Sequence, residues 1–234
     1  MRRNRIRWGV GAACGTALFL VGLIGFAHTP AGRPMLSTVG RLFRGKACPL
    51  GYDRAATPEA RESQRAQFAA LHRGPARAVG KPALGFDLDH ASRTTVASSL
   101  KARGVDCRAA SAVADLVCEN VSGQALPEEF RVNATRDMWF NFGRNDKLIS
   151  VVAVSRATTA PQASAAFRDV CHTIGRRAGP TTHTSGYADA QWLNAGSLHQ
   201  ATNEFAFTDY FASARATNMG KDFLLIEEYR SLVN

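Results

Sequence analysis

Residues 8–27 restrict the fold of this chain most, because twenty consecutive positions carry no charged side chain. A helix of this length is about 30 Å long, which matches the hydrocarbon core of a bilayer. Four arginines precede the segment, and only Arg33 follows it closely. By the positive-inside rule, this asymmetry predicts a transmembrane anchor with a cytoplasmic N-terminus and an extracytoplasmic body.

A cleavable secretory signal is the alternative, since Gly25 and Ala27 have the size and spacing of a cleavage site after Ala27. Glycines also recur at helical spacing within the segment, and such a stripe permits close packing of membrane helices. Homodimerisation or pairing with another span through Gly11, Gly15, Gly22 and Gly25 is therefore one expectation. A monomeric anchor is the other.

The net charge of +10 comes almost entirely from the N-terminal part. Residues 1–47 contain eight arginines and lysines and no acidic residue, which leaves +2 for residues 48–234. A nucleic-acid-binding domain carries its positive charge on the folded body. The distribution therefore argues against nucleic acid as a partner and indicates membrane topology.

Residues 1–28 are thus expected to form the basic tip and anchor, and residues 29–81 a linker that contains one helix. Thr57 is a good N-cap before Pro58, and the helix is expected to end near Leu71. Few of its side chains are large and apolar. We expect a stalk or a weakly docked helix, with a helix on the membrane surface as the alternative.

The body is predicted to be α+β, with two tandem units at 82–156 and 157–234, each packing one helix against an antiparallel sheet. A duplication would explain this repeat, and one continuous domain is the alternative. Helices are expected at 92–103 and 161–177, and strands at 83–88, 105–109, 115–120, 137–143, 147–155, 182–187, 190–194, 204–216 and 222–230.

The hairpin around Asn145 and Asp146 allows a more detailed prediction. A two-residue loop there pairs Phe142 with Ile149 and Phe140 with Val151, which brings the large apolar side chains to one face. The opposite face also carries apolar residues, namely Trp139 and Val152. We therefore expect that second face to be partly covered.

The first unit resembles the SmpA/OmlA type of bacterial outer-membrane lipoprotein domain over residues 83–155. The resemblance rests on Gly85, the helix start at 92–96 (SRTTV) and the closing strands at 139–142 (WFNF) and 147–151 (KLISV). It implies a non-catalytic assembly or scaffolding factor of the bacterial envelope.

Four cysteines lie outside the apolar segment, and an even number in an extracytoplasmic protein suggests disulfides. A hairpin with a two-residue loop at 112–113 places Cys107 directly opposite Cys118, where a bridge can form. The remaining pair, Cys48 and Cys171, is a weaker prediction. Reduced cysteines in the core are the alternative.

Catalytic motifs are weak in this sequence. Cys171 and His172 are adjacent on a predicted helix and point about 100° apart, so they are poorly placed as nucleophile and base. Asp87, Asp89 and His90 could ligate a metal, but no second ligand group stands at a suitable spacing. No P-loop, dinucleotide fingerprint or GxSxG is present. We predict no catalytic residue, no metal site and no cofactor.

The last quarter of the body is rich in aromatic residues. A sheet core is the first explanation, and a surface for a partner is the second. The candidate surface residues are Trp192, Phe205, Phe207, Tyr210, Phe211 and Tyr229.

These features predict a single-pass membrane protein whose body binds or scaffolds an envelope protein without catalysis. The alternatives are a secreted or anchored hydrolase with an unrecognised site, and an inhibitor-like module that presents a concave sheet to an enzyme. Expected partners are the lipid bilayer, an envelope protein and a second copy of the chain.

Overall fold

The computed structural model describes residues 58–109, 114–131, 134–143 and 145–233. The predicted anchor, its glycines Gly11, Gly15, Gly22 and Gly25, and Cys48 all lie outside these residues. Among the helices that are described, none is both long and apolar enough to cross a bilayer.

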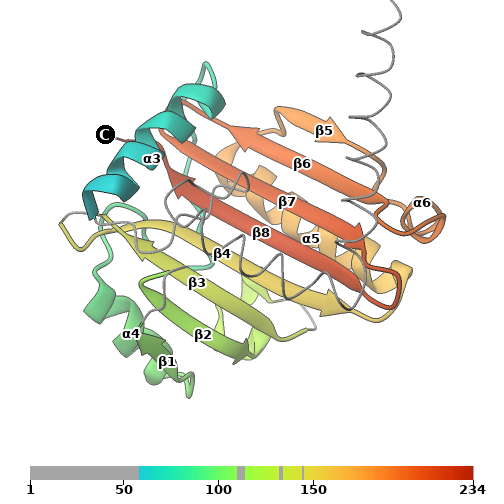
Figure 1. The fold of residues 1–234 in the computed structure, drawn as a ribbon, viewed down its shortest axis with the longest axis horizontal. Helices are drawn as coiled ribbons and strands as arrows, with labels where there is room; N and C mark the ends of the chain where they lie inside the picture. Colours follow the sequence, from blue (N-terminus) through green and yellow to red (C-terminus); the bar gives the residue numbers. More distant parts are fainter. Residues whose placement is uncertain (1–57, 110–113, 132–133, 144, 234) are drawn as a thin grey trace, which may run out of the picture. The chain divides into compact units, whose positions relative to one another are not determined.

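The body is built on one antiparallel sheet of eight strands, which confirms the predicted α+β class (Figure 1). The strands are β1 (Cys107–Ala109), β2 (Leu116–Val121), β3 (Arg136–Phe142), β4 (Leu148–Ala157), β5 (His183–Ser185), β6 (Gln200–Ala206), β7 (Tyr210–Asn218) and β8 (Phe223–Ser231). Their order across the sheet is β1-β2-β3-β4-β8-β7-β6-β5.

This order reads as two meanders that meet at β4 and β8. Strands β1–β4 come from the first predicted unit and β5–β8 from the second. The two halves join through eight antiparallel residue pairs, from Ser150 opposite Arg230 to Ala157 opposite Phe223. Both predicted units therefore contribute to a single continuous sheet.

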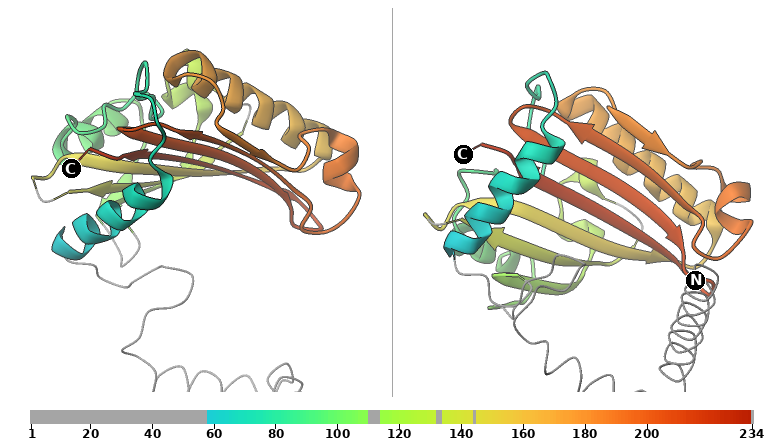
Figure 2. Two further views of the ribbon diagram at one scale, coloured as in Figure 1. Left: turned by 90° about the horizontal axis from the view of Figure 1, so that it is seen from above. Right: turned by 45° about the horizontal axis from the view of Figure 1, so that its top comes forward.

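Helix α5 (Ala160–Ala178) covers one face of the sheet (Figure 2). Thr159 caps its first turn by accepting a hydrogen bond from the backbone N–H of Gln162. The helix ends at Gly179, whose φ of +126° suits glycine. Its apolar stripe is fully buried against the sheet, with Phe167 and Ile174 at most 1% exposed. Burial of this stripe forms the main core.

Helix α3 (Pro58–His72) lies on the opposite face, at one end of β7 and β8 (Figure 2). Phe68 packs edge-on against Phe211 with the ring centroids 5.0 Å apart. The guanidinium of Arg230 lies 4.3 Å from the centre of the Phe68 ring. Ala69 and Leu232 complete this small apolar cluster. The helix is therefore docked on the body.

Helix α4 (Arg93–Lys101) begins after Ser92, whose side chain accepts a hydrogen bond from the Thr95 backbone N–H. Its start is as predicted, and Val96 and Leu100 are buried. Cys107 and Cys118 lie opposite each other in β1 and β2, which confirms that register.

The register of the longer hairpin is only partly as predicted. Phe140 lies opposite Val151, as expected. Phe142, however, lies opposite Leu148 and not Ile149, because the pairing shifts by one residue after Asn141. A bulge of this kind is not visible in residue spacing alone.

Three predicted strands are wrong in detail. Residues 83–88 form a buried loop because Leu84 and Gly85 have positive φ values, which no strand allows. Residues 190–194 form the short helix α6 (Ala190–Asn194), since Asp189 caps it by accepting a hydrogen bond from the Trp192 N–H. The segment 204–216 is interrupted by a turn, where the Phe207 N–H donates to the Tyr210 carbonyl.

Candidate functional site

The sheet arches, with α5 on its outer side and α3 on its inner side (Figure 2). Side chains in a strand alternate between the two faces of the sheet, so the register determines which side chains lie on the face opposite α5. We call this the open face.

An apolar patch lies on the open face beyond α3. Trp139 stands opposite Val152, and Val154 stands opposite Ile226. Leu224 continues the patch along β8. All five side chains are partly exposed, and none belongs to the apolar clusters that the described residues form. Large apolar groups of this kind, left at a sheet surface, are a feature of binding sites.

Polar side chains surround this apolar patch. Arg156 pairs with Asp222 at 2.6 Å, and Glu228 accepts a hydrogen bond from Arg230. Arg215 lies opposite Ile226 and is exposed. An apolar centre with a charged rim is the usual composition of a protein–protein interface.

Most of the aromatic residues lie in the core, as the first explanation from the sequence expects, and not at a partner surface. Phe205, Phe207, Tyr210 and Tyr229 are at most 5% exposed and belong to the core beneath α5. Phe211 is 3% exposed because α3 covers it, and Trp192 is only partly exposed. Aromatic content identified the core here, whereas the open patch is mostly aliphatic and comes from β3, β4 and β8.

Part of the open patch could be recognised from the sequence. Trp139 and Val152 were recognised as apolar residues on the second face of their hairpin. Their continuation through Ile226 and Leu224 depends on the pairing of β4 with β8, which joins residues more than 70 positions apart. Local patterns do not reveal such a pairing.

The predicted disulfide Cys107–Cys118 is confirmed. It joins β1 to β2 at one edge of the sheet, where the two Cα atoms are 4.3 Å apart. Cys171 carries a free thiol, and its predicted partner Cys48 lies outside the described residues.

Burial raises the pKa of the Cys171 thiol to about 12, against an ordinary 9.0. A thiol that stays protonated is a poor nucleophile. We expect alkylation of native Cys171 at pH 8 to be at least about a hundredfold slower than in the unfolded chain. Peptide mass spectrometry after timed iodoacetamide labelling measures both rates. Equal rates in the native and unfolded chain would contradict this prediction.

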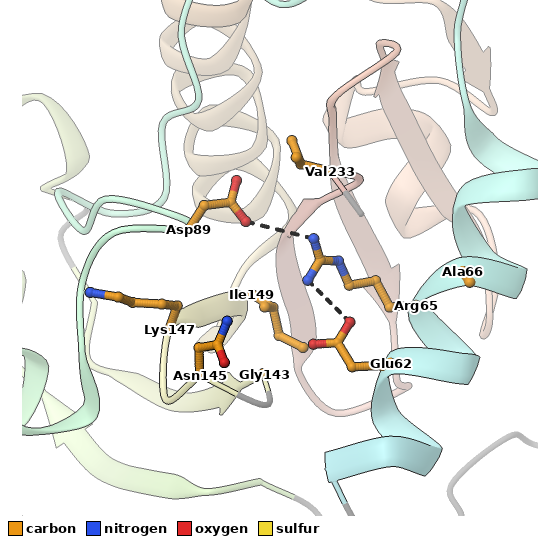
Figure 3. A pocket seen from close by; sticks show the side chains of 9 residues that line it. All are labelled: Glu62, Arg65, Ala66, Asp89, Gly143, Asn145, Lys147, Ile149 and Val233. Carbon is orange, nitrogen blue, oxygen red and sulfur yellow. Dashed lines mark hydrogen bonds and ion pairs between the residues drawn. The ribbon is translucent and has the colours of Figure 1, made fainter.

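A pocket lies between α3, the hairpin of β3 and β4, and the C-terminal segment (Figure 3). It has a volume of about 530 Å³, and both charged and apolar side chains line it. Arg65 points from α3 towards Asp89, at 3.8 Å, and contacts Glu62 at 3.3 Å. Asp89 also accepts a hydrogen bond from Ser231 at 2.7 Å. These contacts join three segments of the body, and no thiol or imidazole is among the described residues that line the pocket.

The sequence motif at Asp87, Asp89 and His90 does not form a metal site in the described part of the chain, where no group of three or more His, Cys, Asp or Glu could hold an ion. Asp89 is paired with Lys81 and Arg65, and the Asp87 carbonyl accepts the Ala91 N–H in a turn. The motif therefore serves the local turn.

Comparisons with known proteins add no relative. No protein family, curated protein or solved structure matches this chain.

Loop 73–81 connects α3 to the core and is fixed by Asp209. The Asp209 carboxylate accepts a hydrogen bond from the Ala78 N–H at 3.1 Å and lies 3.5 Å from Lys81. Burial raises the pKa of Asp209, but the Ala78 amide, Lys81 and Arg77 lower it by more, so the pKa lies below its usual value. The carboxylate therefore stabilises the loop above about pH 4, and this contribution is lost as the pH falls through the lowered pKa.

The variant Asp209→Asn is expected to lose about 1–2 kcal/mol at pH 7 and to show a weaker loss of stability on acidification. Amide hydrogen exchange at Ala78 should become faster. Asp106→Asn, at an exposed position, is the control and should change neither. Unchanged exchange at Ala78 would show that Asp209 does not hold the loop.

Proposed function

We propose that this protein is a single-pass, membrane-anchored module of the bacterial envelope that binds or scaffolds another envelope protein and carries out no catalysis. The observation that carries the proposal is the apolar patch of Trp139, Val152, Val154, Leu224 and Ile226 on the open face. Binding through this patch would remove its apolar side chains from water, which is the main source of affinity in such contacts.

An extracytoplasmic location is supported by the sequence and by the disulfide. The uncharged segment 8–27 follows four arginines, as in a membrane anchor. Disulfides persist in oxidising compartments and are rare in the cytosol. Cys107–Cys118 therefore fits a body outside the cytoplasm.

The sheet order supports a duplication. Each half supplies one meander of four strands, and the order is the same when read inwards from either edge. In each half a helix precedes the strands, α4 in the first and α5 in the second. Two related units joined at β4 and β8 would produce this arrangement.

An inhibitor-like function is the second candidate, because the open face lies on the inner side of the arched sheet (Figure 2). A concave surface of this kind accepts a convex partner such as an enzyme. Purified protein would then reduce the activity of that enzyme in proportion to the amount bound.

The double variant Val152→Lys, Ile226→Lys tests the binding proposal. Two hot-spot side chains that become buried on binding together contribute about 2 kcal/mol or more to the binding free energy. Capture of the envelope partner should therefore weaken at least about thirtyfold. Gln162→Lys, Gln191→Lys is the matched control, since both positions are exposed and lie on α5 and α6. Unchanged capture by the first variant, or equal loss in both, would contradict binding through the open face.

The proposed anchor is tested separately. Alkaline carbonate should leave the full chain in the membrane pellet, and protease added outside the cytoplasm should digest the body. N-terminal sequencing distinguishes the anchor from a signal cleaved after Ala27. A soluble chain that begins at residue 28 would contradict the anchor and show that the protein is secreted.

A further inference from the structure

Two stretches of the body are basic and free of acidic residues. Residues 70–86 contain Arg73, Arg77 and Lys81, and residues 170–188 contain Arg176 and Arg177. The rest of the body has nearly balanced charge. These stretches therefore hold a local excess of positive charge.

The two stretches meet over the end of β6. The Gly74 N–H donates to the Phe207 carbonyl, and a Cβ at Gly179 would lie 3.1 Å from the Phe207 ring. The Val79 N–H donates to the Ala178 carbonyl at 2.9 Å. The loop after α3 is thus laid against the last turn of α5.

Three carboxylates reach this region, and one of them, Asp89, pairs with Lys81 at 3.4 Å. Glu129 pairs with Arg177 at 2.7 Å, and Asp209 lies 3.7 Å from Arg77, whose side chain remains 82% exposed. Arg176 is exposed and has no ion-pair partner among the described residues. A positive excess therefore remains after pairing.

Exposed apolar side chains lie in the same region. Val79 is 88% exposed and Leu71 is 82% exposed, the highest values for large hydrophobic residues in the described part of the chain. Arg77 and Lys81 flank Val79, and Arg73 follows Leu71 by two positions. Exposed aliphatic groups among arginines suit the interface of an anionic bilayer, where the apolar groups enter the headgroup boundary.

We infer that this basic edge, formed by Arg73, Arg77, Val79, Arg176 and Arg177, docks on anionic phospholipid headgroups of the membrane in which the chain is anchored. The inference rests on the proposed anchor only because the anchor would hold the body close to the membrane. The side chains of the basic edge themselves recognise the anionic headgroups. Charge complementarity selects the lipid: each Lys or Arg near an anionic surface contributes a binding factor of about five.

Docking through the basic edge also sets the orientation of the body. Leu198, near the opposite end of β6, is 70% exposed, and its backbone N–H donates to the Asn218 carbonyl. Seven residues of β6 separate the two ends by about 20 Å. The strands therefore extend from the docked edge away from the membrane, and the open face stays accessible to a protein partner.

Photo-crosslinking to lipid tests the inference on the full chain, reconstituted in vesicles of phosphatidylcholine with or without phosphatidylglycerol. Benzoylphenylalanine replaces Val79 in one sample and Leu198 in the other, which is the matched exposed control. We expect lipid adducts from position 79 in vesicles that contain phosphatidylglycerol, at least about fivefold above those from position 198. High salt should reduce them.

Charge removal provides the second arm. Arg77→Gln, Arg176→Gln should weaken docking about thirtyfold, whereas Lys101→Gln, Lys221→Gln removes the same charge from other exposed positions and should have little effect. Circular dichroism of each variant verifies that the body remains folded.

Equal lipid adducts at both positions, adducts independent of phosphatidylglycerol, or a protein adduct in place of lipid at position 79 would overturn the inference. Carbonate extraction of the same vesicles reports on the anchor separately. A chain that is extracted but still forms the adduct at position 79 contradicts the anchor and supports docking. An anchored chain without that adduct contradicts docking alone.

Discussion

Replacing Glu227 by alanine is expected to destabilise the body by about 3–5 kcal/mol, because the change leaves Arg136 charged and unpaired in the core. Glu227 accepts a hydrogen bond from Arg136 Nε at 2.9 Å and another from the Tyr229 hydroxyl at 2.7 Å. Arg136 also donates to the Phe130 carbonyl at 2.8 Å. The two charged side chains are only 1% and 2% exposed.

This ion pair spans the join between the two halves of the sheet. Arg136 lies in β3 and Glu227 in β8, with β4 between them. On β4 the neighbours are Ser155, opposite Arg136, and Ala153, opposite Glu227. Because both are small, the arginine can reach across the intervening strand.

Urea unfolding of the full chain in detergent, followed by tryptophan fluorescence, measures the loss. The double variant Arg136→Met, Glu227→Leu removes both charges and should recover most of the stability. Asp222→Ala breaks the more exposed pair with Arg156 and should cost no more than about 1 kcal/mol. A Glu227→Ala variant as stable as Asp222→Ala would show that the buried pair does not hold the join.

Removal of the disulfide is expected to have the second largest effect. The variant Cys107→Ser, Cys118→Ser should lose about 3 kcal/mol, since the bridge closes a loop of about twelve residues in the unfolded chain. The edge strand β1 has only three residues, and its exposed ion pair of Arg108 with Glu119 contributes little. We expect β1 to separate from β2 first.

Reduction of the wild-type chain with dithiothreitol should produce the same loss, and hydrogen exchange at Arg108 should increase in both cases. Cys171→Ser is the matched control, because Cys171 forms no bridge in the structure. If the double variant unfolds at the same urea concentration as the wild type, the bridge makes no contribution to stability.

Local features of the fold could be predicted from the sequence. The cap at Ser92 and the facing of Cys107 with Cys118 each depend on a few neighbouring residues. Failures occurred where the backbone is unusual, as at Leu84 with positive φ, or where a cap changes a short segment, as at Asp189.

The candidate site could be predicted only in part. Alternation identified the second apolar face of the hairpin at Trp139 and Val152. It does not indicate which face a helix covers, so the choice between core and partner surface for Phe205 and Tyr229 stayed open, and both lie in the core. Local patterns also do not reveal the basic edge, because Val79 and Ala178, which are joined by a backbone hydrogen bond, are about a hundred residues apart in the chain.

The most direct test of the binding proposal is photo-crosslinking in cells from Ile226, on the open face, in the full-length protein. We predict one dominant covalent adduct with an envelope protein, and the same adduct from Val152, which lies in the adjacent strand β4. Ala165, exposed on α5 on the other side of the sheet, should yield none. Equal adducts from Ala165 and Ile226, or an adduct from Ala165 alone, would contradict binding through the open face.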